Sequence, residues 1–533
     1  MSEILFGQAY YLRFDPKLWE AMQPYPPLGT LYAAGYIRSL GYDVALFDAM
    51  LAKSEEEWAQ ALDLHKPRFA VLFEDNFNYL SKMCLLRMRQ AAFDMIEMAR
   101  QRDCTVIVCG ADASDHATDY LARGAEYVLI GEGEVTLGEL LDCLTGRSKT
   151  SLESILGLAF MRSDSPQEST SGKAYRSPEM FRSPRRPDLR DLDSLPFPAW
   201  DLVDVPRYRE IWLKRHGYFS MNMVTTRGCP FHCNWCAKPI WGQRYNVRSP
   251  ENVVAEMEWL KNTYQPNHIW FVDDILGLKP GWLSRFAELV ESRQLRLPFK
   301  CLNRADLLLR DGEINALRRA GCQIVWIGAE SGSQKILDAM DKGVRVEQIR
   351  EATRKLHEDR IQVGFFLQFG YPGENRADIQ KTLALVQDCR PDDIGMSVSY
   401  PLPGTHFFEG VRQQLGAKQN WIDSNDLAML YQGPFPTKFY RQLYVVLHKR
   451  FRLQKASERF IHPQIIAPIQ AASGVRKYPG RLRSLAAMIY HGMTLIPAAA
   501  KLAWLEHQPH QGIEPLPPSM LPESAAQPTR QNE

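Results

Sequence analysis

The stretch Thr225-Thr-Arg-Gly-Cys229-Pro-Phe-His-Cys233-Asn-Trp-Cys236-Ala-Lys directly follows a predicted strand at residues 221–225. It brings three of the chain's ten cysteines within eight positions. Three thiolates can hold three irons of a [4Fe–4S] cubane and leave the fourth iron open to an external ligand. We therefore predict a cluster bound by Cys229, Cys233 and Cys236.

Zinc is the competing metal for these cysteines. A Cys3His site could use His232, but adjacent His232 and Cys233 strain tetrahedral geometry. No second ligand pair follows at zinc-finger spacing. Ten cysteines in 533 residues are also too few for a disulfide scaffold, which favours a reducing compartment.

Alternating strands and helices continue on both sides of the cysteine loop. After it, six βα units predict a barrel or three-quarter barrel with its chemistry at the strand carboxyl ends. Its strands are expected at 221–225, 268–272, 299–303, 324–329, 363–369 and 394–400, and its helices at 250–261, 282–292, 312–320, 346–358 and 377–388. Before it, strands at 4–6, 43–47, 69–73, 105–109 and 126–130 alternate with helices at 28–40, 55–64, 80–100 and 135–144. This second pattern predicts a doubly wound parallel sheet, which binds ligands at the carboxyl ends of its strands.

The remaining segments set the expected domain limits. We predict a Rossmann-like domain at 1–150, a hairpin and linker at 151–217, the barrel at 218–408, a helical region at 409–510 and a disordered tail at 511–533. The hairpin would pair 157–161 with 173–176. An apolar helix at 482–505 has basic flanks, but Pro497 and Lys501 favour a packed or broken helix over docking on a membrane.

The overall charge argues against polyanionic partners. The chain has 64 basic and 62 acidic side chains, a net charge of +2, so no strong field is available to attract nucleic acid. The first residues lack a basic signal region, and no run of 18 uncharged apolar residues occurs. We expect a cytoplasmic protein whose contact with a membrane is at most peripheral.

The cysteine loop, with Trp235 before its third cysteine, resembles the signature of the radical S-adenosylmethionine (SAM) superfamily. The order of domains over about residues 1–405 resembles the cobalamin-binding subfamily. That subfamily includes methyltransferases of unactivated carbon or phosphorus, hopanoid methylases and the anaerobic cyclase of magnesium-protoporphyrin monomethyl ester. The resemblance implies three cofactors, namely a [4Fe–4S] cluster, SAM and cobalamin, and an electron donor such as flavodoxin or ferredoxin.

The resemblance also suggests residues near SAM. Gly328-Ala-Glu330-Ser331-Gly332 is similar to the family segment G-x-E-[ST]-G, whose Glu and Ser lie near SAM. Asp273 ends the second barrel strand and could reach SAM or the substrate, or could instead cap a helix. Asn303 and Arg304 end the third strand and suit the SAM carboxylate or ribose, although a surface turn is an open alternative.

In the N-terminal domain, Tyr25-Pro-Pro-Leu28-Gly29 and Gly131-Glu132-Gly133-Glu134 resemble segments of the cobalamin domain, and Gly110 ends a strand beside them. There is no D-x-H-x-x-G sequence to supply a histidine to cobalt. The nearest fragment, Asp112-Ala-Ser-Asp115-His116, has the wrong spacing. We therefore expect no protein imidazole on the lower cobalt face, with residues 74–78 near it.

The expected function is C-methylation of an unactivated carbon in a natural product, lipid or tetrapyrrole. In this scheme one SAM methylates cobalamin and a second yields the 5′-deoxyadenosyl radical. The alternative is a radical cyclase or oxidase acting on a tetrapyrrole-like substrate. Methylthiolation of tRNA is disfavoured because no second cysteine set or RNA-binding module is present, and a purely sensory role because binding needs no open iron site. An aromatic group after residue 410 would suit a bulky apolar substrate or form simple core, and comprises Trp421, Tyr431, Phe435, Phe439 and Tyr440.

Overall fold

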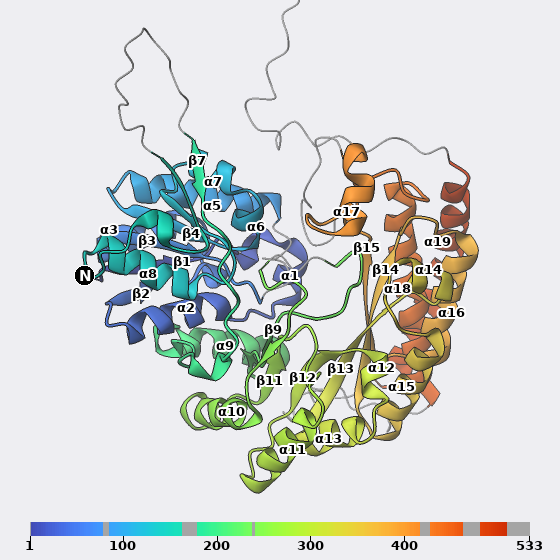
Figure 1. Cartoon of the computed structure of the whole chain (residues 1–533). Coiled ribbons are helices and arrows are strands. Elements are labelled where there is room, and N and C mark those ends of the chain that lie inside the picture. The colour runs from blue at the N-terminus through green and yellow to red at the C-terminus, as the bar shows by residue number, and fades with distance from the viewer. Residues whose placement is uncertain are drawn as a thin grey trace, which may run out of the picture.

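Two sheets, one mixed and one parallel, each with its own helices, make up most of the molecule in the computed structural model (Figure 1). The structure describes residues 2–77, 85–162, 179–236, 240–415, 427–461 and 480–508. The predicted disordered tail and Trp421 lie outside these ranges.

The N-terminal sheet has the strand order β2-β1-β3-β4-β5-β6-β7. Its first five strands are parallel and comprise β1 (Ile4–Gly7), β2 (Val44–Leu46), β3 (Phe69–Phe73), β4 (Thr105–Cys109) and β5 (Tyr127–Leu129). One face packs on α2 (Leu28–Ser39) and α8 (Glu134–Leu144), and the other on α3 (Glu56–His65) and α5 (Leu86–Arg100). Short helices, α1 (Pro16–Ala21), α6 (Ala111–Asp115) and α7 (Ala117–Ala122), complete this unit. The doubly wound prediction is confirmed.

Two strands of this sheet come from the segment predicted as hairpin and linker. Strand β6 (Leu158–Met161) pairs antiparallel with β5 and with β7 (Met180–Arg182). The predicted partner at 173–176 was wrong, because the second strand follows later in the chain. Residues 173–176 themselves lie outside the described ranges.

A second element of that segment was missed. Helix α9 (Val205–His216) begins at Asp204, whose side chain accepts the amide of Arg207, and ends at Gly217 in the left-handed conformation. Both are standard helix-end signals. The Pro-, Arg- and Asp-rich composition around the helix concealed them, although Trp212 is fully buried.

The second sheet is the predicted partial (β/α)6 barrel. Its six parallel strands run in the order β15-β14-β13-β12-β11-β8, and the first and last are not paired, so the barrel is open. The strands are β8 (Ser220–Met223), β11 (His268–Phe271), β12 (Phe299–Asn303), β13 (Cys322–Glu330), β14 (Gln362–Phe369) and β15 (Asp393–Val398). The helices between them are α10 (Pro250–Tyr264), α11 (Trp282–Ser292), α12 (Ala305–Leu308), α13 (Glu313–Ala320), α14 (Gln334–Ala339), α15 (Val346–Glu358) and α16 (Arg376–Cys389). A two-stranded ribbon, β9 (Thr226–Arg227) with β10 (Asn246–Val247), brackets the cysteine loop.

The C-terminal region is helical, as predicted. It comprises α17 (His406–Val411), α18 (Thr437–Ile461) and α19 (Arg481–Glu506). Helix α19 continues through Pro497, so the predicted break was wrong. Pro497 lies on the exposed side of the helix, where water can reach the carbonyl that loses its hydrogen bond.

Candidate functional site

The cysteine loop lies at the carboxyl ends of the barrel strands and is held at its centre by Asn234. The backbone N–H of Asn234 donates to the carbonyl of Met340 (3.1 Å), and its side-chain amide donates to that of Ala339 (2.7 Å). Its side-chain oxygen accepts from the Tyr371 hydroxyl (2.8 Å), and its carbonyl from the N–H of Phe407 (3.1 Å). Four hydrogen bonds thus fix the residue between Cys233 and Cys236 to the ends of three barrel units.

Two cations lie beside the loop. The Arg304 guanidinium lies 3.6 Å from the centre of the Phe231 ring, and Lys342 Nζ lies 6.0 Å from that of Trp235. Lys342 is buried and forms an ion pair with Glu330 (2.8 Å). Burial lowers the pKa of Lys342, but the Glu330 carboxylate outweighs it and raises that pKa overall. Positive charge is therefore held next to a loop whose thiolates are negative.

Glu330 ends β13 in a left-handed backbone conformation, with φ of 54°. Such a conformation costs a non-glycine residue about 1–3 kcal/mol and is concentrated at ligand sites. The neighbouring glycines are needed for space. A Cβ on Gly328 would lie 2.7 Å from both charged groups of the Glu330–Lys342 pair, and one on Gly332 would lie 2.2 Å from the Lys381 carbonyl. The predicted motif thus packs closely around the Glu330–Lys342 ion pair. The Ser331 hydroxyl contacts the Thr382 hydroxyl (3.2 Å).

Asp273 holds the strand that leads into the cysteine loop. Its Oδ1 accepts from the amides of Thr225 (2.7 Å) and Thr226 (2.6 Å) and from the Thr226 hydroxyl (2.8 Å). Burial raises its pKa to about 6 despite these bonds. Its Oδ2 is buried without a hydrogen-bond partner in the described part of the chain. One oxygen therefore has a structural role, and the other is available to a ligand.

Asn303 and Arg304 both organise the turn after β12. The Asn303 side chain donates to the carbonyl of Leu276 (3.0 Å), and Arg304 binds Asp306 (3.0 Å) and the Lys342 carbonyl (2.9 Å). Both side chains are buried, so the surface-turn alternative is wrong. Their contact with SAM stays a prediction.

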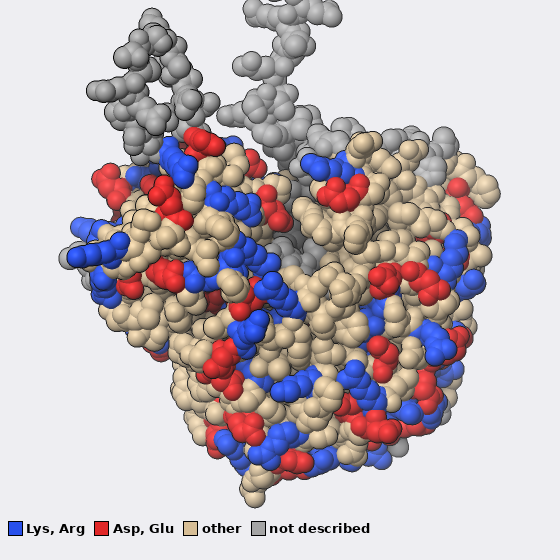
Figure 2. Space-filling model, viewed as in Figure 1, with Lys and Arg blue, Asp and Glu red and all other residues tan. Residues whose placement is uncertain are grey.

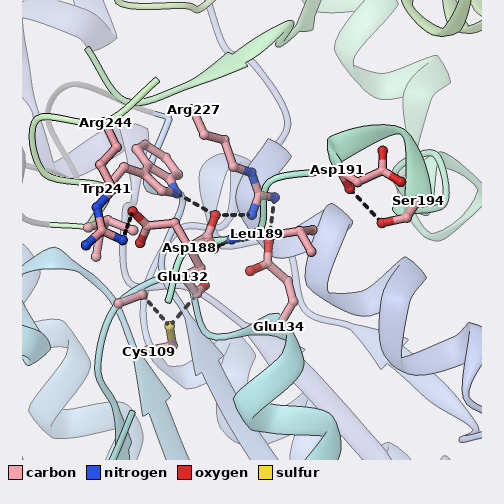
Figure 3. Close-up of polar contacts among 12 residues, drawn as sticks. Cys109, Glu132, Glu134, Asp188, Leu189, Asp191, Ser194, Arg227, Trp241 and Arg244 are labelled. Carbon is pink, nitrogen blue, oxygen red and sulfur yellow. Dashed lines mark hydrogen bonds and ion pairs between the residues drawn. The ribbon is translucent and has the colours of Figure 1, made fainter. Parts of the chain in front are cut away.

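The cysteine loop is also joined to the N-terminal domain (Figure 3). Arg227, two residues before Cys229, contacts Glu132 Oε1 (3.0 Å) and Glu134 Oε1 (2.6 Å), and its side chain is 3% exposed. Burial raises the pKa of Glu134 and Arg227 opposes that rise. Glu132 also accepts from the Trp241 indole (3.1 Å) and from the amide of Leu189 (2.5 Å). Both Glu132 oxygens are therefore occupied by protein contacts.

The glycines of the predicted cobalamin edge are required by backbone geometry or close packing. Gly131 and Gly133 have φ of 98° and 93°, and a Cβ on Gly133 would lie 2.4 Å from the Cys109 sulfur. A Cβ on Gly110 would lie 2.9 Å from the Glu74 side chain. Glycine at these positions therefore allows the turns at the carboxyl edge of the sheet to pack closely on Cys109 and Glu74.

The other N-terminal motifs have structural roles. The carbonyl of Pro26 accepts from the Asn222 amide (3.0 Å), and the Tyr25 hydroxyl contacts that of Ser220 (3.0 Å), so this segment joins the two sheets. Asp112 forms an ion pair with Arg89 and accepts from the Tyr120 hydroxyl (2.8 Å).

Glu74 lies at the predicted cobalamin edge, and its raised pKa gives a testable pH dependence of protein stability. It is half-buried, its carboxylate accepts from the Ala9 amide (2.9 Å), and loss of solvent around it raises its pKa to about 7. Because this pKa lies above the unfolded value, the group's contribution to stability is fully present below about pH 4.5 and is lost as pH rises through about 7.

We expect Glu74→Gln to raise the free energy of unfolding by up to about 3 kcal/mol at pH 8 and to change it little at pH 4. Denaturant titrations at both pH values measure this, and Glu56→Gln, at an exposed position of α3, serves as control. An equal effect of Glu74→Gln at both pH values would contradict the assignment.

The donor chemistry of the loop fits an iron–sulfur cluster. Cys229, Cys233 and Cys236 are half-buried, and His232, the fourth zinc ligand considered above, is exposed. In the described ranges no three His, Cys, Asp or Glu side chains are gathered as a preformed metal site. Two buried polar atoms near the loop, Trp235 Nε1 and Asp273 Oδ2, have no partner in the same ranges. The residues present therefore suit a cluster with a polar ligand beside it.

Comparison with known protein families identifies the barrel. Residues 223–386, from the end of β8 through α16, match the model of the Radical SAM superfamily. This segment is a radical SAM domain. The cysteine loop, Asp273, Asn303, Arg304 and Glu330 all lie within it.

Curated relatives match longer stretches of the chain than the radical SAM domain alone. An uncharacterised methyltransferase of Pyrococcus horikoshii is 28% identical over 55% of this chain and 60% of its own length. The anaerobic magnesium-protoporphyrin IX monomethyl ester cyclase of Synechocystis is 25% identical over 63% of each chain. The hopanoid C-3 methylase of Methylococcus capsulatus is 25% identical over 78% of this chain and 75% of its own length. The matched regions thus span about three fifths of the first two relatives.

Solved structures share the fold beyond the radical SAM domain. The cobalamin-dependent S-adenosylmethionine radical enzyme OxsB has a TM-score of 0.65 over 95% of this chain and 80% of its own, at 14% identity. The radical S-adenosylmethionine methyltransferase TsrM of Kitasatospora setae has a TM-score of 0.60 over 79% and 76%, at 19% identity. These likenesses confirm the predicted arrangement of a Rossmann-like domain and a partial barrel.

The radical SAM domain also contains contacts that the sequence interpretation missed. Lys342, Tyr371 and Asn234 support the cysteine loop, and Arg227 joins it to the other domain. Arg227 and Asn234 lie within the quoted cysteine stretch, whereas Lys342 and Tyr371 carried no sequence signal. Among the C-terminal aromatics, Tyr431, Phe439 and Tyr440 are buried, so the core interpretation is confirmed for them.

Proposed function

We propose that this protein is a cobalamin-dependent radical SAM enzyme that methylates an unactivated carbon of a small apolar molecule. The methyltransferases and the methylase among the relatives support this reaction, and the cobalamin bound in OxsB and TsrM supports the second cofactor. The observation that carries the proposal is the ion-pair contact of Arg227 with Glu132 and Glu134. It sets the cysteine loop against the ligand edge of the Rossmann-like sheet, as a reaction using both cofactors requires.

In this proposal each group of residues has a defined task. Cys229, Cys233 and Cys236 hold the cluster, and Asn234 keeps their loop in place. Glu330 and the free oxygen of Asp273 bind polar groups of SAM, with Ser331, Asn303 and Arg304 shaping the pocket edge. Gly110, Gly131 and Gly133 form the turns at the strand ends where cobalamin would lie, close to Glu132. When bound, the cluster and SAM supply a carbon-centred radical and cobalamin supplies the methyl group.

An aromatic surface inside the barrel supports an apolar substrate. Phe299 contacts Phe286 of α11, so its neighbours Lys300 and Leu302 face away from the helices. Register places Trp326 beside Leu302, on that same inner face. The Trp326 and Phe366 rings are stacked at 4.6 Å, and Phe366 is 39% exposed.

Glycines on the neighbouring strands leave space for the Trp326 and Phe366 rings to lie flat against the sheet. A Cβ on Gly364 would come within 2.4 Å of the Trp326 ring, and one on Gly395 within 3.4 Å of Phe366. Two flat rings on the inner face of the barrel offer a stacking surface for a planar or polycyclic substrate.

Nucleic acid is not proposed as a substrate. On the face shown in Figure 2, acidic and basic side chains are interspersed. Such a surface offers no continuous positive track for phosphates. For the electron that cleaves SAM, we propose a flavodoxin or ferredoxin as the donor.

The proposed reaction can be tested with anaerobically reconstituted enzyme. Protein carrying iron and cobalamin is incubated with CD3-labelled SAM, a reductant and candidate tetrapyrrole, polyketide or terpenoid substrates. We expect both 5′-deoxyadenosine and a product heavier by one CD3 group. Deoxyadenosine formation with an oxidised or cyclised product that carries no label would instead favour the second candidate, a radical cyclase, which the Synechocystis relative supports.

A further inference from the structure

Helix α19 presents a long apolar face that nothing in the described ranges covers. Along one side of the helix, large apolar side chains recur every three or four residues from Leu482 to Ile496, and Trp504 follows two turns later on the same side, which is the spacing of a single helical stripe. Their exposed fractions are 82% for Leu482, 40% for Leu485, 54% for Ile489, 69% for Met493, 73% for Ile496 and 61% for Trp504. The opposite side, with Ser484, Ala498 and Leu505, is buried. Exposed apolar stripes of this length mark an interaction surface.

The surroundings of this stripe are strongly basic. Residues 437–506, which include α18 and α19, contain twelve Lys and Arg but two acidic residues, Glu458 and Glu506. The rest of the chain must carry a net negative charge, because the whole chain is only +2. At the start of the stripe, Arg481 and Arg483 are exposed, and Lys501 is exposed near its end. The positive charge is thus concentrated on the helices that carry the apolar face.

We propose that α18 and α19 form a docking element that binds the surface of an anionic lipid bilayer. Apolar side chains would enter the region below the headgroups, while the arginines and lysines contact lipid phosphates. Tyr490 and Trp504 suit this boundary, because their rings have both an apolar body and a polar atom. The combination of a wide apolar stripe with cationic flanks is typical of helices that lie in the membrane interface.

The contacts of α19 favour lying on the membrane over crossing it. By length and composition the helix could span a bilayer, and 6% of its most apolar window is buried. However, Lys449 of α18 donates to the Thr494 hydroxyl (2.7 Å), and Gln442 to the Ala498 carbonyl (2.8 Å). Arg376 of α16 forms an ion pair with Glu506. A spanning helix would have to leave these polar partners, whereas a surface helix keeps them.

The same charges disfavour a second copy of this chain as the occupant. A twofold interface would place two basic helix pairs against one another. Such an arrangement juxtaposes like charges, which costs several kcal/mol at an interface. Anionic lipid provides both the opposite charge and an apolar layer in one surface.

Vesicle flotation with the full-length protein tests this proposal. We expect binding to vesicles of phosphatidylcholine mixed with phosphatidylglycerol, weaker binding at high salt, and little binding to phosphatidylcholine alone. The double variant Ile489→Asp, Met493→Asp should bind the mixed vesicles about a hundredfold more weakly. Charge reversal at Arg481→Glu, Arg483→Glu should weaken binding about tenfold on mixed vesicles only.

Matched controls separate docking from damage to the fold. Leu64→Asp alters an equally exposed apolar residue (73%) on α3 and should leave vesicle binding unchanged. Iron content and circular dichroism of all variants should match the wild type, since none of these side chains is buried. Two results would overturn the proposal. One is equal binding by the wild type and the Ile489/Met493 variant. The other is that the wild type does not bind vesicles but dimerises or captures an acidic protein, and that the Ile489/Met493 variant loses this association.

Discussion

Replacing Cys233 by alanine is expected to remove the iron–sulfur cluster and to lower 5′-deoxyadenosine production by more than about a hundredfold. Two remaining thiolates cannot hold three irons of a cubane. The loop itself should stay in place, because Asn234 and not Cys233 provides the hydrogen bonds to the barrel. Iron and sulfide analysis, the absorption spectrum and the paramagnetic signal of reduced protein measure the first effect, and product analysis measures the second.

The control for this experiment is Cys143→Ala. Cys143 is also half-buried, but it belongs to α8 in the N-terminal domain. Its replacement should leave the cluster signals and the yield of deoxyadenosine at wild-type values. A Cys233→Ala protein that assembles a full cluster, or a wild-type protein that binds zinc in its place, would remove the basis of the proposed function.

Replacing Arg227 by alanine is expected to lower the free energy of unfolding by about 3–5 kcal/mol. The Arg227 side chain is 3% exposed, and its removal leaves the carboxylates of Glu132 and Glu134 buried without their cation. Burial raises the pKa of Glu134 and Arg227 opposes that rise, so the Glu134 carboxylate takes up a proton more readily in the variant and the deficit should shrink as pH falls. Denaturant unfolding at several pH values measures both effects.

An exposed ion pair serves as the reference for this variant. Arg354 contacts Glu351 (2.6 Å) on the surface of α15, with its side chain 54% exposed, so Arg354→Ala should cost less than about 1 kcal/mol. The same small cost for Arg227→Ala would mean that the two domains are held together elsewhere. A double-mutant cycle that combines Arg227→Ala with Glu134→Gln measures the interaction energy of the Arg227–Glu134 pair.

The fold could be predicted because its signals are local. The strand at 299–303 and the helices at 282–292 and 346–358 were predicted with the bounds that the structure has. The alternation of short apolar runs with amphipathic helices was enough to separate the two sheets. Elements without such a pattern were lost, as with α9 and the second strand of the hairpin.

The site could be predicted only where residues belong to one motif. The cysteine loop and the Gly328–Gly332 segment are contiguous, so spacing alone indicated their chemistry. Lys342 and Tyr371 reach the loop from other βα units, 106 and 135 positions beyond Cys236, and no single sequence encodes that proximity. Glu132 is a different case, since both of its carboxylate oxygens bind protein atoms and its contact with cobalamin stays a prediction.

The link through Arg227 has a consequence for how the two halves communicate. Only one residue separates Arg227 from Cys229, and a chain of that length spans no more than about 7 Å. We therefore expect any rotation of the Rossmann-like half to move Cys229, the first of the three proposed cluster ligands. A ligand bound to the Rossmann-like half should thus alter the reduction potential of a cluster bound to the barrel.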